Sequence, residues 1–159
     1  MKFVAYTDGY FDMNDRVGAS ACIILSEDKS MVLHRWVKAR RCKPSEKKQL
    51  NNEQELGAFV HAAQAVPVGS ELCIVSDSMY CVKVLGGIWQ ANANLEIISA
   101  FRETVKRKNL TIFTEWVRGH NGDTYNEAAD ALCGWLANYL RGSGKNVLVW
   151  KDGDISETK

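Results

Sequence analysis

The sequence predicts an α/β domain built on a five-stranded mixed sheet, with the first three strands antiparallel, the rest parallel, and helices on both faces. Three observations carry this prediction. The chain has 159 residues, of which 46% are hydrophobic, as expected for one globular domain. Strand-like segments fill its first quarter, and helix-like segments then alternate with apolar strand-like runs.

The N-terminal segment predicts three strands joined by short connections. Residues Lys2–Thr7 alternate and contain β-formers, so they deliver Asp8 to the end of a strand. Gly18–Leu25 predicts the second strand and Met31–Arg40 the third, with the turn SEDK between them. Consecutive strands with such short connections pair antiparallel.

The remaining elements alternate in type. Apolar spacing and terminal glycines predict four helices, at residues 52–66, 78–87, 95–108 and 124–140. A short apolar run predicts a buried strand at Glu71–Asp77, and Leu110–Val117 predicts a further strand. A helix between two strands allows them to pair in parallel. Thr124 and Glu127 match a capping box that would begin the last helix.

The domain is expected to span residues 1–141 and to be followed by a tail at residues 142–159. The tail contains a Gly/Ser hinge, a short apolar run and a polar end, so it is expected to form either a short added strand or a mobile segment.

Composition excludes several classes of protein. No segment approaches the roughly 18 uninterrupted apolar residues of a membrane span, and no signal peptide is recognisable, so the expected location is the cytoplasm. The five cysteines form no C-x-x-C pair and are expected to be reduced and buried. A net charge of +1 does not by itself indicate a nucleic-acid-binding protein.

Four acidic residues stand at positions that suit a site. Asp8 and Asp77 end predicted strands, Glu55 lies on the first helix, and Asp130 lies on the last helix. Parallel strands would bring the two aspartates to one edge of the sheet. Each acid alone is more simply a surface charge or a helix cap, but together they would repel one another unless cations were bound. Oxygen-only ligands favour Mg²⁺ or Mn²⁺ over zinc.

Two further groups of residues lie near this set in the sequence. His120, in a loop before the last helix, suits proton transfer or product release, although an isolated loop histidine is more often inert. A basic run from Arg35 to Lys48 leads into Asn51 and Asn52; its simpler interpretation is a solvated strand edge, and that of the two asparagines is helix capping.

Four motifs, taken in order, resemble type 1 ribonuclease H. They are YTDG at residues 6–9, NNEQE at 51–55, SDSMY at 76–80 and GHNGDTYNEAADALC at 119–133. Each motif alone is weak, but the ordered set is specific and covers the chain to about Leu140. The chain resembles a compact member of this family, because it has neither the long basic insertion of some bacterial members nor a separate hybrid-binding domain.

The resemblance implies hydrolysis of the RNA strand of RNA/DNA hybrids to 5′-phosphate and 3′-hydroxyl products by a two-metal-ion mechanism. It implies that Asp8 bridges two Mg²⁺ ions, with Mn²⁺ as a substitute. Asp130 would help to hold the ion that activates water, and Glu55 and Asp77 would hold the ion at the leaving oxygen. His120 matches a loop histidine that assists water activation or product departure.

The resemblance also implies which residues contact the hybrid. Asn51 and Asn52 match asparagines that read the minor groove, where the 2′-hydroxyls lie. Asn14 stands six residues after Asp8, as a comparable asparagine does in relatives, but the Gly- and Pro-rich turn of many relatives is replaced here. Met79 stands where a glutamine is common.

The basic run supplies candidate phosphate contacts in place of the missing insertion. Arg40, Arg41 and Lys43 are the residues proposed for this role. The expected partner is the hybrid duplex, with no membrane and no obligate protein partner, and the chain is expected to be a monomer. Two alternatives remain: a catalytically impaired relative that only binds nucleic acid, and a different nuclease of the same fold that acts on DNA.

Overall fold

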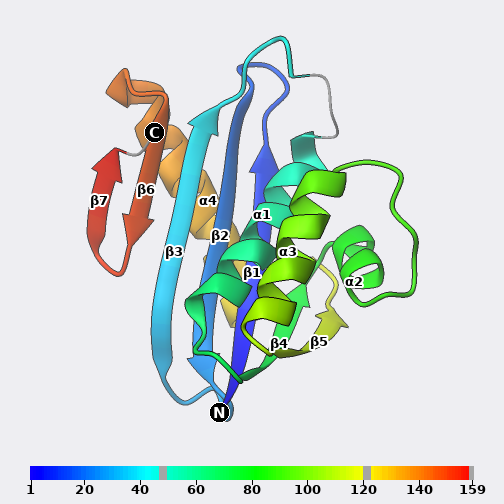
Figure 1. Cartoon of the computed structure of the whole chain (residues 1–159). Coiled ribbons are helices and arrows are strands. Elements are labelled where there is room, and N and C mark those ends of the chain that lie inside the picture. The colour runs from blue at the N-terminus through cyan, green and yellow to red at the C-terminus, as the bar shows by residue number, and fades with distance from the viewer. Residues whose placement is uncertain (47–49, 120–122, 158–159) are drawn as a thin grey trace.

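The computed structural model describes residues 1–46, 50–119 and 123–157. Within these ranges one sheet has seven strands in the order β5-β4-β1-β2-β3-β6-β7 (Figure 1). The strands are β1 (Lys2–Phe11), β2 (Val17–Ser26), β3 (Val32–Arg41), β4 (Glu71–Ser76), β5 (Thr111–Trp116), β6 (Val147–Lys151) and β7 (Asp154–Glu157). The helices of the described ranges are α1 (Leu50–Ala65), α2 (Met79–Leu85), α3 (Leu95–Arg107) and α4 (Thr124–Ser143).

The predicted order and pairing of the first five strands are confirmed. β1, β2 and β3 form an antiparallel meander, and β4 pairs in parallel with both β1 and β5. The parallel pairs arise because each of the connections from β3 to β4 and from β4 to β5 contains helix, which returns the chain to the starting edge of the sheet.

The prediction of a five-stranded sheet is wrong, because the C-terminal segment adds two strands. β6 pairs antiparallel with β3, for example at Val37 and Trp150, and β7 pairs with β6. The outer edge of β3 offers unpaired backbone groups that this hairpin satisfies. Asp152 and Gly153 form its two-residue turn with φ values of 48° and 102°, the positive values that a type I′ hairpin turn requires.

Helices cover both faces of the sheet, as the sequence predicts. α1, α2 and α3 lie on one face, and α4 crosses the other face behind β1, β2 and β3 (Figure 1). Leu56 and Phe59 of α1 are fully buried on the first side, and Leu136 and Leu140 of α4 are fully buried on the second. The two apolar layers fix the sheet between the helices, with its edges exposed.

The start of α4 differs from the predicted capping box. Asp123 is the N-cap, and its side chain accepts hydrogen bonds from the backbone N–H groups of Tyr125 and Asn126 at 3.1 and 3.0 Å. Thr124 is therefore the first helical residue. The Asp123 carboxylate satisfies two N–H groups of the first turn and adds a negative charge that the helix dipole favours.

The cysteines are reduced and mostly buried, as composition predicts. All five cysteines are free, and four of them are buried, which confirms that they act as small apolar residues; only Cys73 is partly exposed. Among the helices of the described residues, none is both long enough and apolar enough to cross a bilayer.

Candidate metal centre

The parallel pairing of β1 and β4 brings two aspartates to one edge of the sheet. The paired residues end at Tyr6 on β1 and Val75 on β4. Asp8 and Asp77 each follow this last pair by two residues on their own chain segment. The same alignment therefore places the two aspartates next to each other. Side chains two residues apart on a strand share a face, which places these carboxylates side by side.

Gly9 lets α1 come close enough to bring Glu55 to the same place. A Cβ atom at Gly9 would collide with the backbone nitrogen of Glu55 and would lie 2.8 Å from the Glu55 Cα and from the carbonyl carbon of Gln54. Only a residue without a side chain permits this approach of helix to strand. The glycine after Asp8 therefore sets the position of the third carboxylate.

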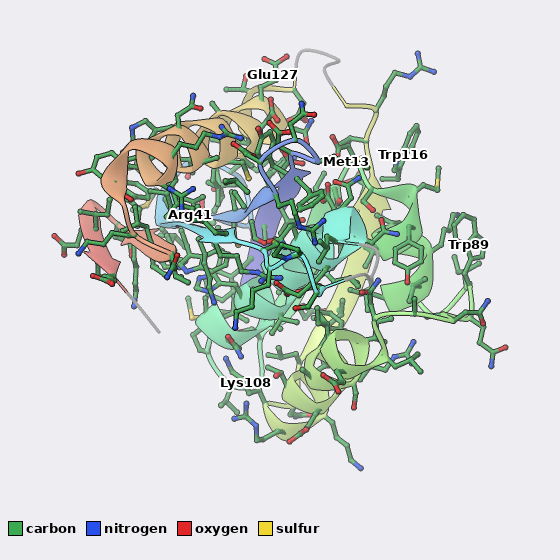
Figure 2. The ribbon with its side chains drawn as sticks, turned by 90° about the horizontal axis from the view of Figure 1, so that it is seen from above. Met13, Arg41, Trp89, Lys108, Trp116 and Glu127 are labelled. Atoms are coloured by element: carbon green, nitrogen blue, oxygen red, sulfur yellow. The ribbon has the colours of Figure 1, made fainter. Side chains whose placement is uncertain are left out.

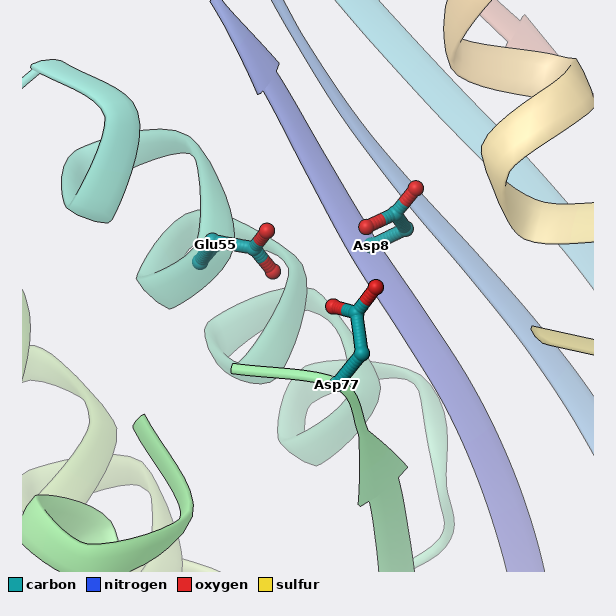
Figure 3. Close-up of side chains that lie close together, drawn as sticks. All are labelled: Asp8, Glu55 and Asp77. Carbon is teal, nitrogen blue, oxygen red and sulfur yellow. The ribbon is translucent and has the colours of Figure 1, made fainter. Parts of the chain in front are cut away.

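The three carboxylates point toward one another from β1, α1 and the loop after β4 (Figure 3). One ligand oxygen from each of Asp8, Glu55 and Asp77 lies within 4.8 Å of the others. Asp8 is 4% exposed and Glu55 8% exposed, so these two are largely removed from water. Asp77 is half-buried and opens the cluster to solvent.

Burial and mutual repulsion shift the protonation of this cluster. Desolvation, followed by the charges of Asp77 and Asp130, raises the pKa of Asp8 to about 8. Desolvation and the charges of Asp8 and Asp77 raise the pKa of Glu55 well above its ordinary value. The Gly9 backbone N–H opposes both shifts by hydrogen bonding. Without a cation, the centre therefore holds its negative charge at a high cost in free energy.

The donor atoms of this centre fit a hard cation. Glu55 Oε2 is buried and has no hydrogen-bond partner among the described residues. The three potential ligands offer oxygen only, which suits Mg²⁺ or Mn²⁺ better than a softer ion. A bound divalent ion would occupy the lone pairs of that oxygen and neutralise the repulsion within the cluster.

Asp130 lies beside this trio but not within it. It is exposed on α4, and its side chain contributes a hydrogen bond and a negative charge that raise the pKa of Asp8. Cys133, one turn later on α4, packs against the same strand with its Sγ atom 3.8 Å from the Asp8 carbonyl oxygen. The structure thus brings Asp8, Glu55 and Asp77 together and leaves Asp130 at the margin, next to Asp8.

The loop that follows β5 begins against this centre. His120 itself lies outside the described residues. Its neighbour Gly119 is described, and a Cβ atom there would lie 2.8 Å from Asp77 Oδ2. The absence of a side chain at Gly119 therefore leaves room for the Asp77 carboxylate.

The three asparagines assigned to substrate contact lie in two places. Asn51 and Asn52 are in the first turn of α1, which begins at Leu50, so neither is the residue that precedes the helix. Asn51 is exposed and Asn52 partly exposed. Asn14 is exposed in the turn between β1 and β2, where its backbone N–H donates to Asp12 at 2.8 Å.

The three basic residues proposed for phosphate contact, in the run from Arg35 to Lys48, have different surroundings. Arg40 donates to Glu46 at 3.0 Å and to Glu53 at 2.7 Å, whereas Lys43 is exposed. Arg41 donates from Nη2 to the Leu140 carbonyl oxygen at 2.8 Å and so holds the C-terminal part of α4. Figure 2, a view from above, shows Arg41 on the side of α4, away from Trp89 and Trp116.

Two glycines were not predicted as parts of the site. The role of Gly9 depends on how closely α1 docks on β1, and that of Gly119 depends on where the last loop meets Asp77. Neither contact involves neighbours in sequence. The sequence indicates these roles only through the position of each glycine: Gly9 directly follows Asp8, and Gly119 directly precedes His120.

The sequence is similar to known ribonucleases over most of its length. A sequence model of the RNase H family matches residues 1–137. A ribonuclease H of Ruegeria sp. is 32% identical over 155 residues, covering 89% of this chain and 95% of the relative. A ribonuclease H of Dinoroseobacter shibae is 32% identical over 148 residues, covering 82% of this chain and 88% of that relative.

Solved structures share the fold. The N-terminal RNase H domain of Rv2228c from Mycobacterium tuberculosis, studied as a fusion with maltose binding protein, superposes with a TM-score of 0.72 at 21% identity, over 89% of this chain and 97% of the other. RNase H1 from the halophilic archaeon Halobacterium salinarum superposes with a TM-score of 0.71 at 21% identity, over 87% and 99% of the two chains.

Proposed function

The chain belongs to the ribonuclease H family, and from this premise we propose that it hydrolyses the RNA strand of RNA/DNA hybrids with two divalent metal ions. The products would carry 5′-phosphate and 3′-hydroxyl ends. The observation that carries the proposal is the convergence of Asp8, Glu55 and Asp77 within 4.8 Å, just beyond the last pair of β1 and β4.

Four acidic side chains would bind the two ions. Asp8, central among the acids, would contact both ions, which we propose to be Mg²⁺, with Mn²⁺ as a substitute. Glu55 and Asp77 would hold the ion on the leaving-group side, and Asp130, next to Asp8, would help to hold the other. When bound, such a pair activates water and stabilises the departing oxygen of a phosphodiester.

His120 is proposed to move a proton at the start or end of the reaction. An imidazole with its ordinary pKa of roughly 6.5 can accept a proton from the attacking water or give one to the departing product. The position of Gly119 supports this role, because a Cβ atom there would lie 2.8 Å from Asp77 Oδ2, so the loop that leads to His120 starts beside the acidic centre.

Substrate contacts are proposed for three asparagines and three basic residues. Asn51 and Asn52, together with Asn14, would donate to and accept from the 2′-hydroxyls and base edges of the minor groove. Their exposure supports this proposal. Lys43, Arg40 and Arg41 would contact phosphates, although a phosphate would compete with the present protein partners of the two arginines. The chain would act on the duplex as a monomer.

Cleavage of matched duplexes tests the proposal. The chain is incubated with Mg²⁺ and labelled RNA/DNA, RNA/RNA and DNA/DNA duplexes of one sequence, and the ends of the products are identified. Cleavage of only the RNA in the hybrid supports the proposal. Binding without cleavage would indicate a relative that only binds nucleic acid, and cleavage of DNA would indicate a different nuclease.

A substitution in the centre assigns the activity to these acids. Asp77→Asn keeps the size of the side chain but removes a charged ligand, so hybrid cleavage should be lost while the far-ultraviolet circular dichroism is retained. Asp154→Asn, the same change on the exposed strand β7, is the matched control and should cleave like the unaltered chain. Substantial cleavage by Asp77→Asn would contradict the assignment.

A further inference from the structure

A second group of metal-binding side chains lies away from the acidic centre, where three elements meet. His34 of β3 and His61 of α1 face each other, with their Nε2 atoms 2.8 Å apart. On the other side of the His34 ring, Nδ1 lies 2.8 Å from Oδ2 of Asp152, in the turn between β6 and β7. This row of two imidazoles and a carboxylate joins residues far apart in the sequence.

Neighbouring groups hold both rings in place. The Trp36 indole stacks on the His61 imidazole with ring centroids 3.9 Å apart and planes inclined by 5°. The second oxygen of Asp152 accepts the backbone N–H of Arg35 at 2.7 Å, which fixes the carboxylate. The Asp152 side chain is 46% exposed and the His34 side chain 14% exposed, so the row runs inward from the surface. In Figure 1 the C-terminal half of α1 approaches β3 on the side where the β6–β7 turn lies.

We propose that His34 and His61 together bind one borderline divalent transition metal ion, Zn²⁺ or Cu²⁺, through their Nε2 atoms. Imidazole nitrogen suits these two ions. With Zn–N bonds of roughly 2.0–2.1 Å, two neighbouring nitrogens on a tetrahedral ion lie roughly 3.3 Å apart. The rings therefore need to separate by about half an ångström and also to tilt. They lie nearly coplanar and head to head, with ring centroids 5.1 Å apart and planes inclined by 20°, so both Nε2 atoms now point along the line between them. Water from the nearby surface completes the coordination.

Asp152 prepares the pair for an ion. Its carboxylate accepts the Nδ1–H of His34, which leaves the Nε2 lone pair of that ring directed at His61. Carboxylates hydrogen-bonded to the far nitrogen of a histidine ligand orient the ring and increase its basicity. On binding, His61 carries its ring proton on Nδ1 instead of Nε2, so neither imidazole changes its charge.

The site is distinct from the acidic centre in position and in chemistry. His61 follows Glu55 by six residues on α1, which is a rise of about 9 Å along the helix. Its ligands are nitrogen atoms, whereas those of the acidic centre are carboxylate oxygens that favour Mg²⁺. The proposal therefore does not depend on the proposed function, and an ion at His34 and His61 need not affect hybrid cleavage.

Cu²⁺ titration followed by electron paramagnetic resonance tests the proposal. The tag-free full chain carries Asp77→Asn in every arm, with excess Mg²⁺ present, so that ions at the acidic centre do not contribute. One saturable Cu²⁺ per chain, with coupling to two imidazole nitrogens, is expected. His61→Gln and His34→Gln should each remove one nitrogen and weaken binding by at least about 10-fold, and Asp152→Asn should weaken it by about 10- to 100-fold with both nitrogens retained.

The proposal requires both saturable Cu²⁺ binding and weaker binding in the histidine variants. No saturable binding, or binding unchanged in His61→Gln, means that the pair is only an N–H···N hydrogen bond. Nuclear magnetic resonance of the chain with both histidines intact removes any dependence on the folding of these variants. Cu²⁺ should broaden the ring signals of His34 and His61 first, and broadening confined to His120 would contradict the proposal.

Discussion

Asp8 shows how much the acidic centre depends on a cation. In the metal-free folded chain the pKa of Asp8 is raised to about 8, whereas its ordinary value is 3.8. Between pH 3.8 and about 8, Asp8 is therefore protonated in the folded chain and ionised in the unfolded chain. Between these two values the folded state binds more protons, so its stability falls as the pH rises. Part of the folding free energy is thus lost at neutral pH unless a cation replaces the proton.

Asp8→Asn should remove the part of this pH dependence that Asp8 contributes. In EDTA, the variant should match the unaltered chain near pH 4 and exceed it by about 1–3 kcal/mol near pH 8, because an amide has no charge to desolvate. Urea unfolding at a series of pH values measures the difference. Asp154→Asn, on exposed β7, should leave the pH dependence unchanged. A constant difference between Asp8→Asn and the unaltered chain at all pH values would show that ionisation of Asp8 is not the cause.

Gly9→Ala should damage both stability and the metal centre. The new Cβ would meet backbone atoms of Glu55 and Gln54, which cannot rotate away, so α1 must shift. We expect a loss of about 1–3 kcal/mol in the free energy of unfolding, together with weaker Mg²⁺ binding measured by calorimetry.

Gly134→Ala is the matched control for this change. Gly134 lies within α4, and a Cβ atom there would meet nothing within 4 Å. This substitution should stabilise the helix by about 0.5–1 kcal/mol and leave Mg²⁺ binding unaltered. If the two alanine variants bound Mg²⁺ equally well, the close approach of α1 at Gly9 would not position Glu55.

At the scale of elements, one lysine caps the C-terminal end of α1. Lys108, directly after α3, donates from Nζ to the carbonyl oxygens of Ala63 at 2.9 Å, Gln64 at 2.7 Å and Val66. These acceptors belong to the end of α1 and the residue that follows it, where carbonyl groups lack helical partners and a positive charge is favoured. The lysine therefore joins the two helices that cover one face of the sheet.

Lys108→Met should uncap α1. The change keeps an apolar stem but removes the ammonium, so we expect a loss of about 1–2 kcal/mol in the free energy of unfolding. Amide hydrogen exchange should accelerate in the last turn of α1. Lys106→Met, an exposed position on α3, is the control and should change the stability little. Equal stabilities of the two variants would mean that the capping contacts contribute nothing.

The helices and strands that could be predicted from the sequence are those with a clear spacing of apolar residues. Four apolar-patterned helices and five strands appear in the predicted order, because alternation and helical spacing reflect which side is buried. Their ends moved where tertiary pairing extends them: β1 continues past Thr7 to Phe11 because β2 pairs with it as far as Gly18. The local patterns therefore specify the elements better than their limits.

For the tail, the sequence predicted either one short added strand or a mobile segment, and the hairpin of β6 and β7 agrees with the first alternative but adds a second strand. The choice could not be made from the sequence because each strand is short and depends on the edge of β3. Their strand residues number only five and four, too few for a clear alternation. One signal was available: Asp152-Gly153 is a dipeptide typical of two-residue hairpin turns. For the site, parallel pairing predicted the meeting of Asp8 and Asp77, but the position of Asp130 beside the trio depends on how α4 docks on the other face.

At the scale of the whole molecule, charge distribution matters more than net charge. The chain carries a net charge of +1, so attraction to a duplex must come from local groups. Lys43 is exposed, whereas Arg40 and Arg41 hold Glu46, Glu53 and the end of α4. Among the three proposed phosphate contacts, Lys43 is therefore the one whose removal disturbs the fold least.

Lys43→Ala should weaken hybrid binding and flatten its dependence on salt. Loss of one phosphate contact should lower the slope of log affinity against log salt concentration by about 1. The triple change of Arg40, Arg41 and Lys43 to Ala should lower it further and also reduce stability. Binding is measured with Ca²⁺ in place of Mg²⁺. Lys2→Ala, at the start of β1 and far along the strand from Asp8, is the control. An unchanged slope in the triple variant would remove the basic run from the substrate interface.

The most direct test of the metal centre is anomalous X-ray diffraction from crystals of the chain with Mn²⁺ and an RNA/DNA hybrid, in which Asp77→Asn prevents cleavage. Mn²⁺ should replace Mg²⁺ and give strong peaks between the RNA phosphate and the carboxylates of Asp8, Glu55 and Asp130, with the site next to residue 77 weakened. A hybrid bound elsewhere on the molecule, or Mn²⁺ peaks away from these carboxylates, would contradict the account.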